Sequence, residues 1–196
     1  MEPIVVERKA LPNNLVLIGM FGSGKSTVGR DLAQRIRYDF VDVDQLIERR
    51  FQKPLGRIME ILGMKEFMKA EEETILTLRH RHCVIATGGS AVYYPKAIRH
   101  LKSLGLCVFL KVPLAELKSR VGDQLKPHVV RRGGNTLRAL FSERRPLYER
   151  YADLTVEAVG PSAEVVTNKI LYQLGAIPIL PPVKRAKTRR KAVARR

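Results

Sequence analysis

The sequence predicts the α/β class, with a mostly parallel β-sheet that is covered by helices on both faces. Short aliphatic runs with the length of buried strands alternate along the chain with segments whose apolar residues recur at helical spacing. The first aliphatic run ends in a glycine-rich loop, GMFGSGKS at residues 19–26, which leads directly into helical periodicity. Such alternation is typical of parallel sheets, whose strands are buried on both sides.

The predicted elements follow one another with short connections. The expected strands cover residues 14–19, 40–43, 83–86, 106–112 and 154–156. The expected helices cover residues 26–36, 44–51, 54–63, 65–80, 113–121, 136–144 and 162–174, with Pro54 opening and Gly63 closing the third of them. Residues 122–134 combine glycine, proline and basic residues without periodicity, which predicts a mobile loop.

Length and composition indicate one globular domain with a tail. The 196 residues are 45% hydrophobic and 28% charged, and no apolar run approaches the roughly 18 residues of a membrane span. We expect a cytoplasmic monomer without membrane contact. Cys83 and Cys107 lie inside apolar runs, which predicts buried thiols rather than a disulfide or a metal site.

The charge of the chain is concentrated at its C-terminus. The net charge is +17, and residues 182–196 alone hold eight lysines and arginines without an acidic residue. We therefore predict a domain over residues 1–176 and a Pro-rich, basic, disordered tail over residues 177–196. Such a tail binds phosphates through counterion release whatever the fold does, so a nucleotide-dependent nucleic-acid-binding protein is the alternative from a different class.

The loop at residues 19–26 matches the phosphate-binding pattern G-x-x-x-x-G-K-[ST] between a predicted strand and a predicted helix. Glycines let successive N–H groups face phosphate oxygens, and the helix N-terminus adds partial positive charge. Lys25 is expected to reach the β- and γ-phosphates, and the Ser26 hydroxyl to coordinate Mg²⁺. The alternative is a glycine-rich turn with an unrelated lysine. The predicted ATP-binding residues in this loop are Gly22, Ser23, Gly24, Lys25, Ser26 and Thr27.

Two carboxylates, Asp42 and Asp44, flank the C-terminal end of the second predicted strand. Ligands of open parallel sheets bind beyond those ends, so both side chains are expected to face the phosphates. Phosphoryl transfer needs one carboxylate near hydrated Mg²⁺ and another that orients or deprotonates the attacking hydroxyl. The alternative is that Asp44 only caps the following helix.

Four segments together resemble the shikimate kinase family over residues 14–174. They are the phosphate-binding loop, FVDVD at residues 40–44, ATGGSAV at 86–92 and ERRPLYERYADLTV at 143–156. The resemblance implies a three-layer P-loop fold like that of nucleoside monophosphate kinases, with a five-stranded parallel sheet and a mobile lid. It also implies Mg²⁺- and ATP-dependent transfer of the γ-phosphate to a ring hydroxyl of shikimate, which gives shikimate 3-phosphate.

The resemblance implies roles for individual residues. Asp42 would support Mg²⁺, and Asp44 would hold or activate the acceptor hydroxyl. Gly88 and Gly89 would offer backbone contacts to the substrate, and Arg120 would lie over the adenine. From the lid, one arginine would turn toward the transferring phosphoryl group. The predicted catalytic residues, with the lid arginine chosen from Arg131 and Arg132, are Lys25, Asp44 and Arg132.

Arg144 is also singled out by its spacing. It follows Leu137, Leu140 and Phe141 at i+7, i+4 and i+3, which places the guanidinium on the stripe that faces a core or a cleft. A cation placed there needs an anionic partner. The partner is either a substrate carboxylate, as the resemblance implies, or a structural acid.

Two positions near the predicted site limit what the resemblance implies about the substrate. The family usually has an arginine after Phe67 and a third glycine after Gly89, whereas this chain has Met68 and Ser90. A thioether cannot pair with a carboxylate, and the loss of one charged hydrogen bond costs about 1.5–3 kcal/mol. A kinase for another hydroxy acid, such as homoserine, is therefore the alternative. Glu71 lies on the apolar stripe of its helix and is expected to orient Arg144 or a substrate hydroxyl, or to form a structural salt bridge.

Overall fold

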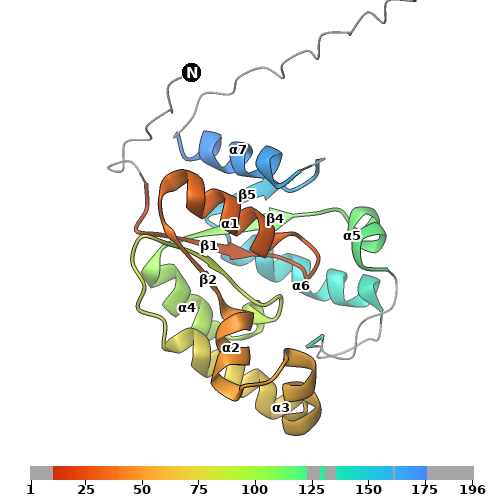
Figure 1. Ribbon diagram of the computed structural model, residues 1–196. Helices are drawn as coiled ribbons and strands as arrows, with labels where there is room; N and C mark the ends of the chain where they lie inside the picture. The colour runs from red at the N-terminus through yellow and green to blue at the C-terminus, as the bar shows by residue number, and fades with distance from the viewer. Residues whose placement is uncertain (1–10, 123–128, 131–135, 161, 176–196) are drawn as a thin grey trace, which may run out of the picture.

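Five parallel strands form one sheet in the computed structural model, in the order β2-β3-β1-β4-β5 (Figure 1). The structure describes residues 11–122, 129–130, 136–160 and 162–175. The strands are β1 (Asn14–Ile18), β2 (Asp39–Asp42), β3 (Cys83–Ala86), β4 (Leu106–Lys111) and β5 (Leu154–Glu157). All four strand pairings are parallel, which confirms the predicted α/β class.

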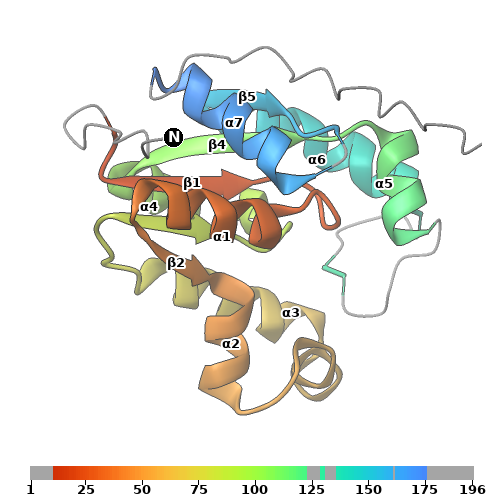
Figure 2. The same cartoon turned by 45° about the horizontal axis from the view of Figure 1, so that its top comes forward.

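Helices cover both faces of this sheet. They are α1 (Lys25–Ile36), α2 (Val43–Phe51), α3 (Leu55–Leu76), α4 (Pro95–Leu104), α5 (Leu114–Val121), α6 (Leu137–Tyr151) and α7 (Ala163–Gln173), with a short 3-10 helix η2 (Ala91–Tyr93). α1 and α7 pack together on one face, while α4 and α6 lie on the other (Figures 1 and 2). α2 and α3 pack on each other beyond the edge strand β2, and α3 also packs against α4.

The strand register brings three sequence motifs to one edge of the sheet. Leu17 of β1 and Asp42 of β2 are both paired with Ala86 of β3, so the three strands end at the same level. The phosphate-binding loop follows β1, Asp44 follows β2, and the glycine pair follows β3. Ligands of parallel sheets bind at this edge, because the connections there diverge and leave a crevice.

The structure differs from the predicted elements mainly in α4 and α6. The helix predicted for residues 136–144 continues to Tyr151 through Pro146, because Tyr148 extends the buried stripe of Leu140 and Arg144. A proline there removes one backbone donor, and the packing of the stripe offsets that loss. The short 3-10 helix and α4 were not predicted, although Pro95 stands in the first turn of α4, where proline is favoured.

The predicted helix break at Gly63 is confirmed. This residue has φ 73° and ψ 165° inside α3, a conformation in the left-handed half of the map that glycine adopts without a steric cost. The last turn of α3 ends at Leu76 rather than at residue 80. No helix in the described part of the chain is long and apolar enough to cross a membrane.

Two of the predicted segments fall largely outside the described residues. The structure describes only residues 122, 129 and 130 of the predicted mobile loop at 122–134. The predicted disordered tail at residues 177–196 lies wholly outside the described residues. Both assignments therefore stay predictions.

Both cysteines are expected to resist alkylation in the native protein. Cys83 and Cys107 lie on central strands with no exposed surface. Burial raises the pKa of Cys83 to about 11 and that of Cys107 to about 12, so the reactive thiolate is scarce at pH 8. Mass spectrometry after iodoacetamide treatment should find no adduct on folded protein and two adducts after unfolding in urea. Rapid labelling of the folded chain would contradict this burial.

Candidate active site

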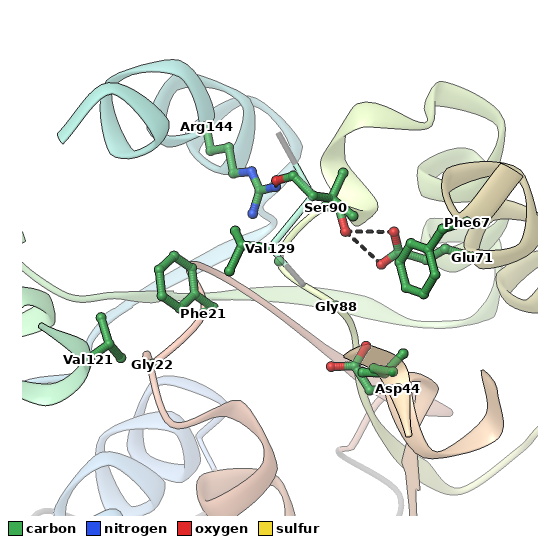
Figure 3. Close-up of a pocket in the computed structure, with 13 residues that line it drawn as sticks. Phe21, Gly22, Asp44, Phe67, Glu71, Gly88, Ser90, Val121, Val129 and Arg144 are labelled. Carbon is green, nitrogen blue, oxygen red and sulfur yellow. Dashed lines mark hydrogen bonds between the residues drawn. The ribbon is translucent and has the colours of Figure 1, made fainter. Parts of the chain in front are cut away.

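A pocket of about 290 Å³ lies where the phosphate-binding loop, α2, α3, the glycine pair and α6 meet (Figure 3). Its polar side chains are Asp44, Glu71, Ser90 and Arg144. Its remaining lining residues, mostly apolar, are Phe21, Gly22, Leu55, Phe67, Gly88, Gly89, Val121, Val129 and Val130. A small volume with apolar walls and a few convergent polar groups is typical of a site for a small polar metabolite.

The phosphate-binding loop has the backbone shape that its glycines predict. Gly22 and Gly24 have φ values of 76° and 89°, in the region that side chains rarely adopt. The Lys25 ammonium is almost buried and donates to the carbonyl oxygens of Gly19 at 2.9 Å and Met20 at 2.8 Å. Burial lowers the pKa of Lys25 to about 8, and the nearby Asp44 carboxylate opposes that shift. Phosphate oxygens bound by this loop would contact the poorly hydrated ammonium group of Lys25.

Asp42 connects the loop to α2. Its Oδ2 accepts a hydrogen bond from the Ser26 hydroxyl at 2.7 Å, and its Oδ1 accepts one from the backbone N–H of Asp44 at 3.1 Å. Asp42 is therefore the N-cap of α2, the role that the alternative interpretation gave to Asp44. The side chain of Asp44 is left to face the pocket.

The carboxyl group of Asp44 lies in a poorly solvated position. Burial raises its pKa to about 7, and the carboxylates of Glu71 and Asp42 contribute to the same shift. Lys25 acts in the opposite direction. A carboxyl group in such surroundings accepts a proton more readily than an exposed aspartate does.

Gly88 and Gly89 allow the charged side chains to approach the backbone closely. A Cβ atom on Gly88 would lie 2.2 Å from Glu71 Oε1 and 3.0 Å from Asp44 Oδ1, and one on Gly89 would lie 2.9 Å from Arg144 Nη1. The backbone of the two glycines therefore lies between the guanidinium of Arg144 and the carboxyl groups of Glu71 and Asp44. Figure 3 shows Arg144 and Asp44 on opposite sides of Gly88.

Arg144 is buried, as its spacing predicts, with 1% of its surface exposed. Its Nε donates to the Tyr93 hydroxyl at 3.1 Å, its guanidinium carbon lies 4.8 Å from the centre of the Tyr93 ring, and its Nη2 donates to the backbone carbonyl of Val130. Among the described residues no carboxylate forms an ion pair with it. The structure therefore leaves room for the interpretation in which a ligand supplies the anion.

Glu71 is equally buried, and its described partners are hydroxyl groups rather than cations. The Ser90 hydroxyl lies 2.8 Å from Oε1 and 2.6 Å from Oε2, and the Tyr94 hydroxyl donates to Oε2 at 2.6 Å. Burial raises the pKa of Glu71, while these hydrogen bonds oppose the shift. A structural salt bridge, one of the predicted alternatives, is not formed by Glu71 within the described residues.

Tyr148 holds the backbone of the glycine pair in place through a hydrogen bond to Gly89. Its hydroxyl donates to the Gly89 carbonyl at 2.6 Å, and its ring stacks on Phe109 of β4 at 5.1 Å. Tyr148→Phe should lower the free energy of unfolding by about 1 kcal/mol, because a partly buried carbonyl loses its donor. Urea titration measures this change, with Tyr172→Phe as a half-exposed control that should stay within about 0.5 kcal/mol of wild type. Equal effects of both variants would contradict the anchoring role.

A second hollow borders the other side of the phosphate-binding loop. It is lined by Ser23, Gly24, Thr27, Glu116, Arg120, Ala158 and Gly160, among others. Arg120 is held there by Glu116 at 3.0 Å and by the backbone carbonyls of Gly22 and Ala158. Its predicted place over an adenine ring stays a prediction, and its position beside the loop is compatible with it.

The structure distributes the described site residues between two hollows, one on each side of the phosphate-binding loop. Gly22, Asp44, Gly88, Gly89 and Arg144 line the pocket. Ser23, Gly24, Thr27 and Arg120 line the second hollow, and Lys25, Ser26 and Asp42 lie in the loop and at the end of β2. Arg131 and Arg132 lie outside the described residues, so the catalytic role predicted for Arg132 stays a prediction. Met68 packs against the core, and Lys69 lines a different hollow together with Arg50 and Glu73, so it does not replace the missing arginine.

Sequence reasoning missed Tyr93, Tyr94 and Tyr148. Each hydroxyl is bonded to a residue at least 23 positions away in the chain. The available signal was the presence of two adjacent tyrosines in an otherwise apolar stretch, since a buried tyrosine hydroxyl usually has a partner.

Comparison with known proteins adds independent observations. Residues 21–175 match the family described as Shikimate kinase. A protein of Escherichia coli named Shikimate kinase 1 is 37% identical over 165 residues, which cover 82% of this chain and 95% of that protein. A solved shikimate kinase of Acinetobacter baumannii in complex with shikimate has a TM-score of 0.73 and 32% identity, covering 83% of this chain and 92% of its own. One from Aquifex aeolicus has a TM-score of 0.68 and 32% identity, covering 83% and 96%.

Proposed function

The chain belongs to the shikimate kinase family, and we propose from that premise that it transfers the γ-phosphate of ATP to a ring hydroxyl of shikimate to give shikimate 3-phosphate. It is a phosphotransferase with an alcohol group as acceptor. The observation that carries the proposal is the pocket itself, in which the guanidinium of Arg144 and the carboxyl group of Asp44 lie on opposite sides of Gly88. A small molecule with a carboxylate at one end and hydroxyl groups at the other matches this arrangement.

On the donor side, the N–H groups of residues 22–27 would hold the phosphates of ATP at the N-terminus of α1. Lys25 would exchange its bonds to the Gly19 and Met20 carbonyls for bonds to the β- and γ-phosphates. Arg120 would contact the adenine from the hollow beside the loop. The N–H groups and Lys25 would neutralise the charge that accumulates on the transferring phosphoryl group.

ATP use by a kinase family implies a metal bound with the nucleotide, and we propose Mg²⁺. Ser26 and Asp42 present a hydroxyl and a carboxylate oxygen 2.7 Å apart at the end of the loop, and hard oxygen donors of this kind suit Mg²⁺. No cluster of three or more metal-binding side chains occurs in the described part of the chain. Magnesium ions bound with nucleotides generally take only one or two carboxylate ligands from the protein. A metal ion held there by Ser26 and Asp42 would supply positive charge that stabilises the negative charge of the phosphates.

On the acceptor side, Arg144 would bind the carboxylate of shikimate through its remaining N–H groups, with backbone contacts from Gly88 and Gly89. Asp44 would accept a hydrogen bond from the attacking hydroxyl. As the new O–P bond forms, the bond between the γ-phosphorus and the bridging oxygen of ADP breaks, and the hydroxyl proton passes to Asp44 and then to solvent.

The direct test is ADP release by the purified full chain with Mg²⁺–ATP and either shikimate or homoserine. Shikimate should be phosphorylated and homoserine should be inert, because homoserine lacks the ring and the additional hydroxyls that the pocket can contact. Turnover of homoserine alone would reject the proposed acceptor. Nothing in the comparisons favours homoserine or a nucleic-acid-binding function. We also propose that the protein acts as a cytoplasmic monomer, with residues 1–176 as the kinase domain.

A further inference from the structure

The environment of Glu71 is unusual for a buried acid. Only 1% of its surface is exposed, and a buried carboxylate normally has a cation beside it. Here the position one helical turn earlier on α3 is Met68, which packs against the core. The hydroxyls of Ser90 and Tyr94 are the described donors to Glu71, and they come from the connection between β3 and α4.

These two hydroxyls leave the carboxyl group of Glu71 partly unsatisfied. A carboxylate offers about four acceptor positions, and two hydroxyls supply two protons. Oε2 lies within hydrogen-bonding distance of both hydroxyls, whereas Oε1 is near the Ser90 hydroxyl but not that of Tyr94. The less occupied oxygen, Oε1, therefore retains acceptor capacity.

That oxygen faces the same space as the Asp44 carboxyl group. Glu71 Oε1 and Asp44 Oδ1 both crowd the point where a Cβ atom of Gly88 would stand, at 2.2 Å and 3.0 Å. Both residues line the pocket (Figure 3). The two carboxylate oxygens lie close enough together to accept hydrogen bonds from two hydroxyl groups on neighbouring carbon atoms of one ligand.

We propose that Ser90 and Tyr94 are positioning residues that hold Glu71 so that its Oε1 accepts a hydrogen bond from the hydroxyl adjacent to the one that Asp44 orients. The proposal rests on the proposed function and adds to it a protein partner for a second hydroxyl group of the substrate. Glu71 would then contribute to selectivity, because an acid that lacks the second hydroxyl leaves a buried acceptor without a donor.

The experiment compares ligand affinities by calorimetry. The ligands are shikimate, an analogue without the hydroxyl adjacent to the acceptor hydroxyl, and an analogue without the more distant ring hydroxyl. The proteins are the full-length wild type, Tyr94→Phe, and a double variant carrying Ser90→Ala and Tyr94→Phe. Tyr38→Phe is the matched control, since the Tyr38 hydroxyl donates at 3.0 Å to Pro12, away from the pocket.

The wild type should bind shikimate about 10- to 100-fold more tightly than the analogue without the adjacent hydroxyl. This ratio should fall to within about threefold of unity in the double variant, and partway in Tyr94→Phe, while the Kd for ATP stays unchanged. Tyr38→Phe should keep the wild-type ratio. A purely structural role of the two hydroxyls would weaken all three ligands alike and leave the ratio unchanged.

Each outcome is decisive. A wild-type ratio near one, or a ratio that the variants leave intact, overturns the inference; if the double variant does not fold, an unchanged ratio in Tyr94→Phe alone overturns it. The expected ratios without phosphate transfer would support the inference and reject the proposed function. Phosphate transfer to shikimate without the expected ratios would support the proposed function and reject the inference. No binding of shikimate would overturn both.

Discussion

Replacement of Asp44 by asparagine should lower kcat for shikimate by about 10²- to 10⁴-fold, the range expected when a general base is lost. The amide has nearly the shape of the carboxyl group, so it can still contact the acceptor hydroxyl, but it cannot take up the proton. The start of α2 should be unaffected, because its cap is Asp42 bonded to the backbone of residue 44. Asp44→Asn should therefore fold as the wild type does.

Steady-state ADP release at saturating ATP and shikimate measures this effect, with thermal unfolding as the check on folding. Asp39→Asn is a suitable control, since Asp39 lies at the start of the preceding strand, exposed and outside the pocket. That control should retain wild-type turnover. An Asp44→Asn enzyme within about tenfold of wild type would show that the proton leaves by a route other than this carboxylate.

Arg144→Met should lower kcat/KM for shikimate by about 10²-fold or more, mainly through KM, because two charge-assisted hydrogen bonds to the substrate carboxylate would be lost. Each such bond contributes about 1.5–3 kcal/mol. Methionine fills much of the same volume but offers no donor. The KM for ATP should stay near its wild-type value, because the nucleotide would lie on the other side of the phosphate-binding loop.

The adjacent Arg145→Met is the matched control. Arg145 is nearly half exposed and pairs with Glu149 at 2.9 Å, an i,i+4 surface pair that contributes little. Its kinetic constants should stay within about twofold of wild type. If Arg144→Met reduced thermal stability yet left the KM for shikimate unchanged, the arginine would be a structural residue that Tyr93 and Val130 satisfy.

The parts of the site that depend on local sequence were predictable. A glycine-rich loop between a strand and a helix has one common physical use, and the periodic placement of Arg144 and Glu71 on apolar stripes indicated that both side chains are buried. Asp42 and Asp44 were assigned to the same edge because parallel strands end together. Each of these predictions uses information within about ten residues of the position concerned.

Long-range contacts were not predictable from these patterns. The bond between Tyr148 and Gly89 joins residues 59 positions apart, and the one between Arg144 and Tyr93 joins residues 51 positions apart. Periodicity places such side chains on a buried face but does not say which polar groups they meet there. The continuation of α6 beyond Pro146 was missed for a related reason, since tertiary packing decided against local propensity.

The fold shows a consequence of Met68 that differs from the one inferred from the sequence. In the sequence, the missing arginine indicated a weaker carboxylate site. In the fold, the buried acid one helical turn away, Glu71, is held by Ser90 and Tyr94 instead of by a cation. The pocket therefore has neutral donors around this carboxyl group, and Arg144 is the one side-chain cation among its described lining residues.

One carboxylate, that of Asp42, links the two halves of the site mechanically. Its two oxygens are divided between the hydroxyl of Ser26 and the backbone of Asp44, so it cannot move toward one without pulling on the other. Any displacement of this carboxylate would therefore shift the first turn of α2, which carries Asp44. The alignment that we propose for the acceptor hydroxyl at Asp44 would thus depend on the contact between Asp42 and Ser26 on the nucleotide side of the site.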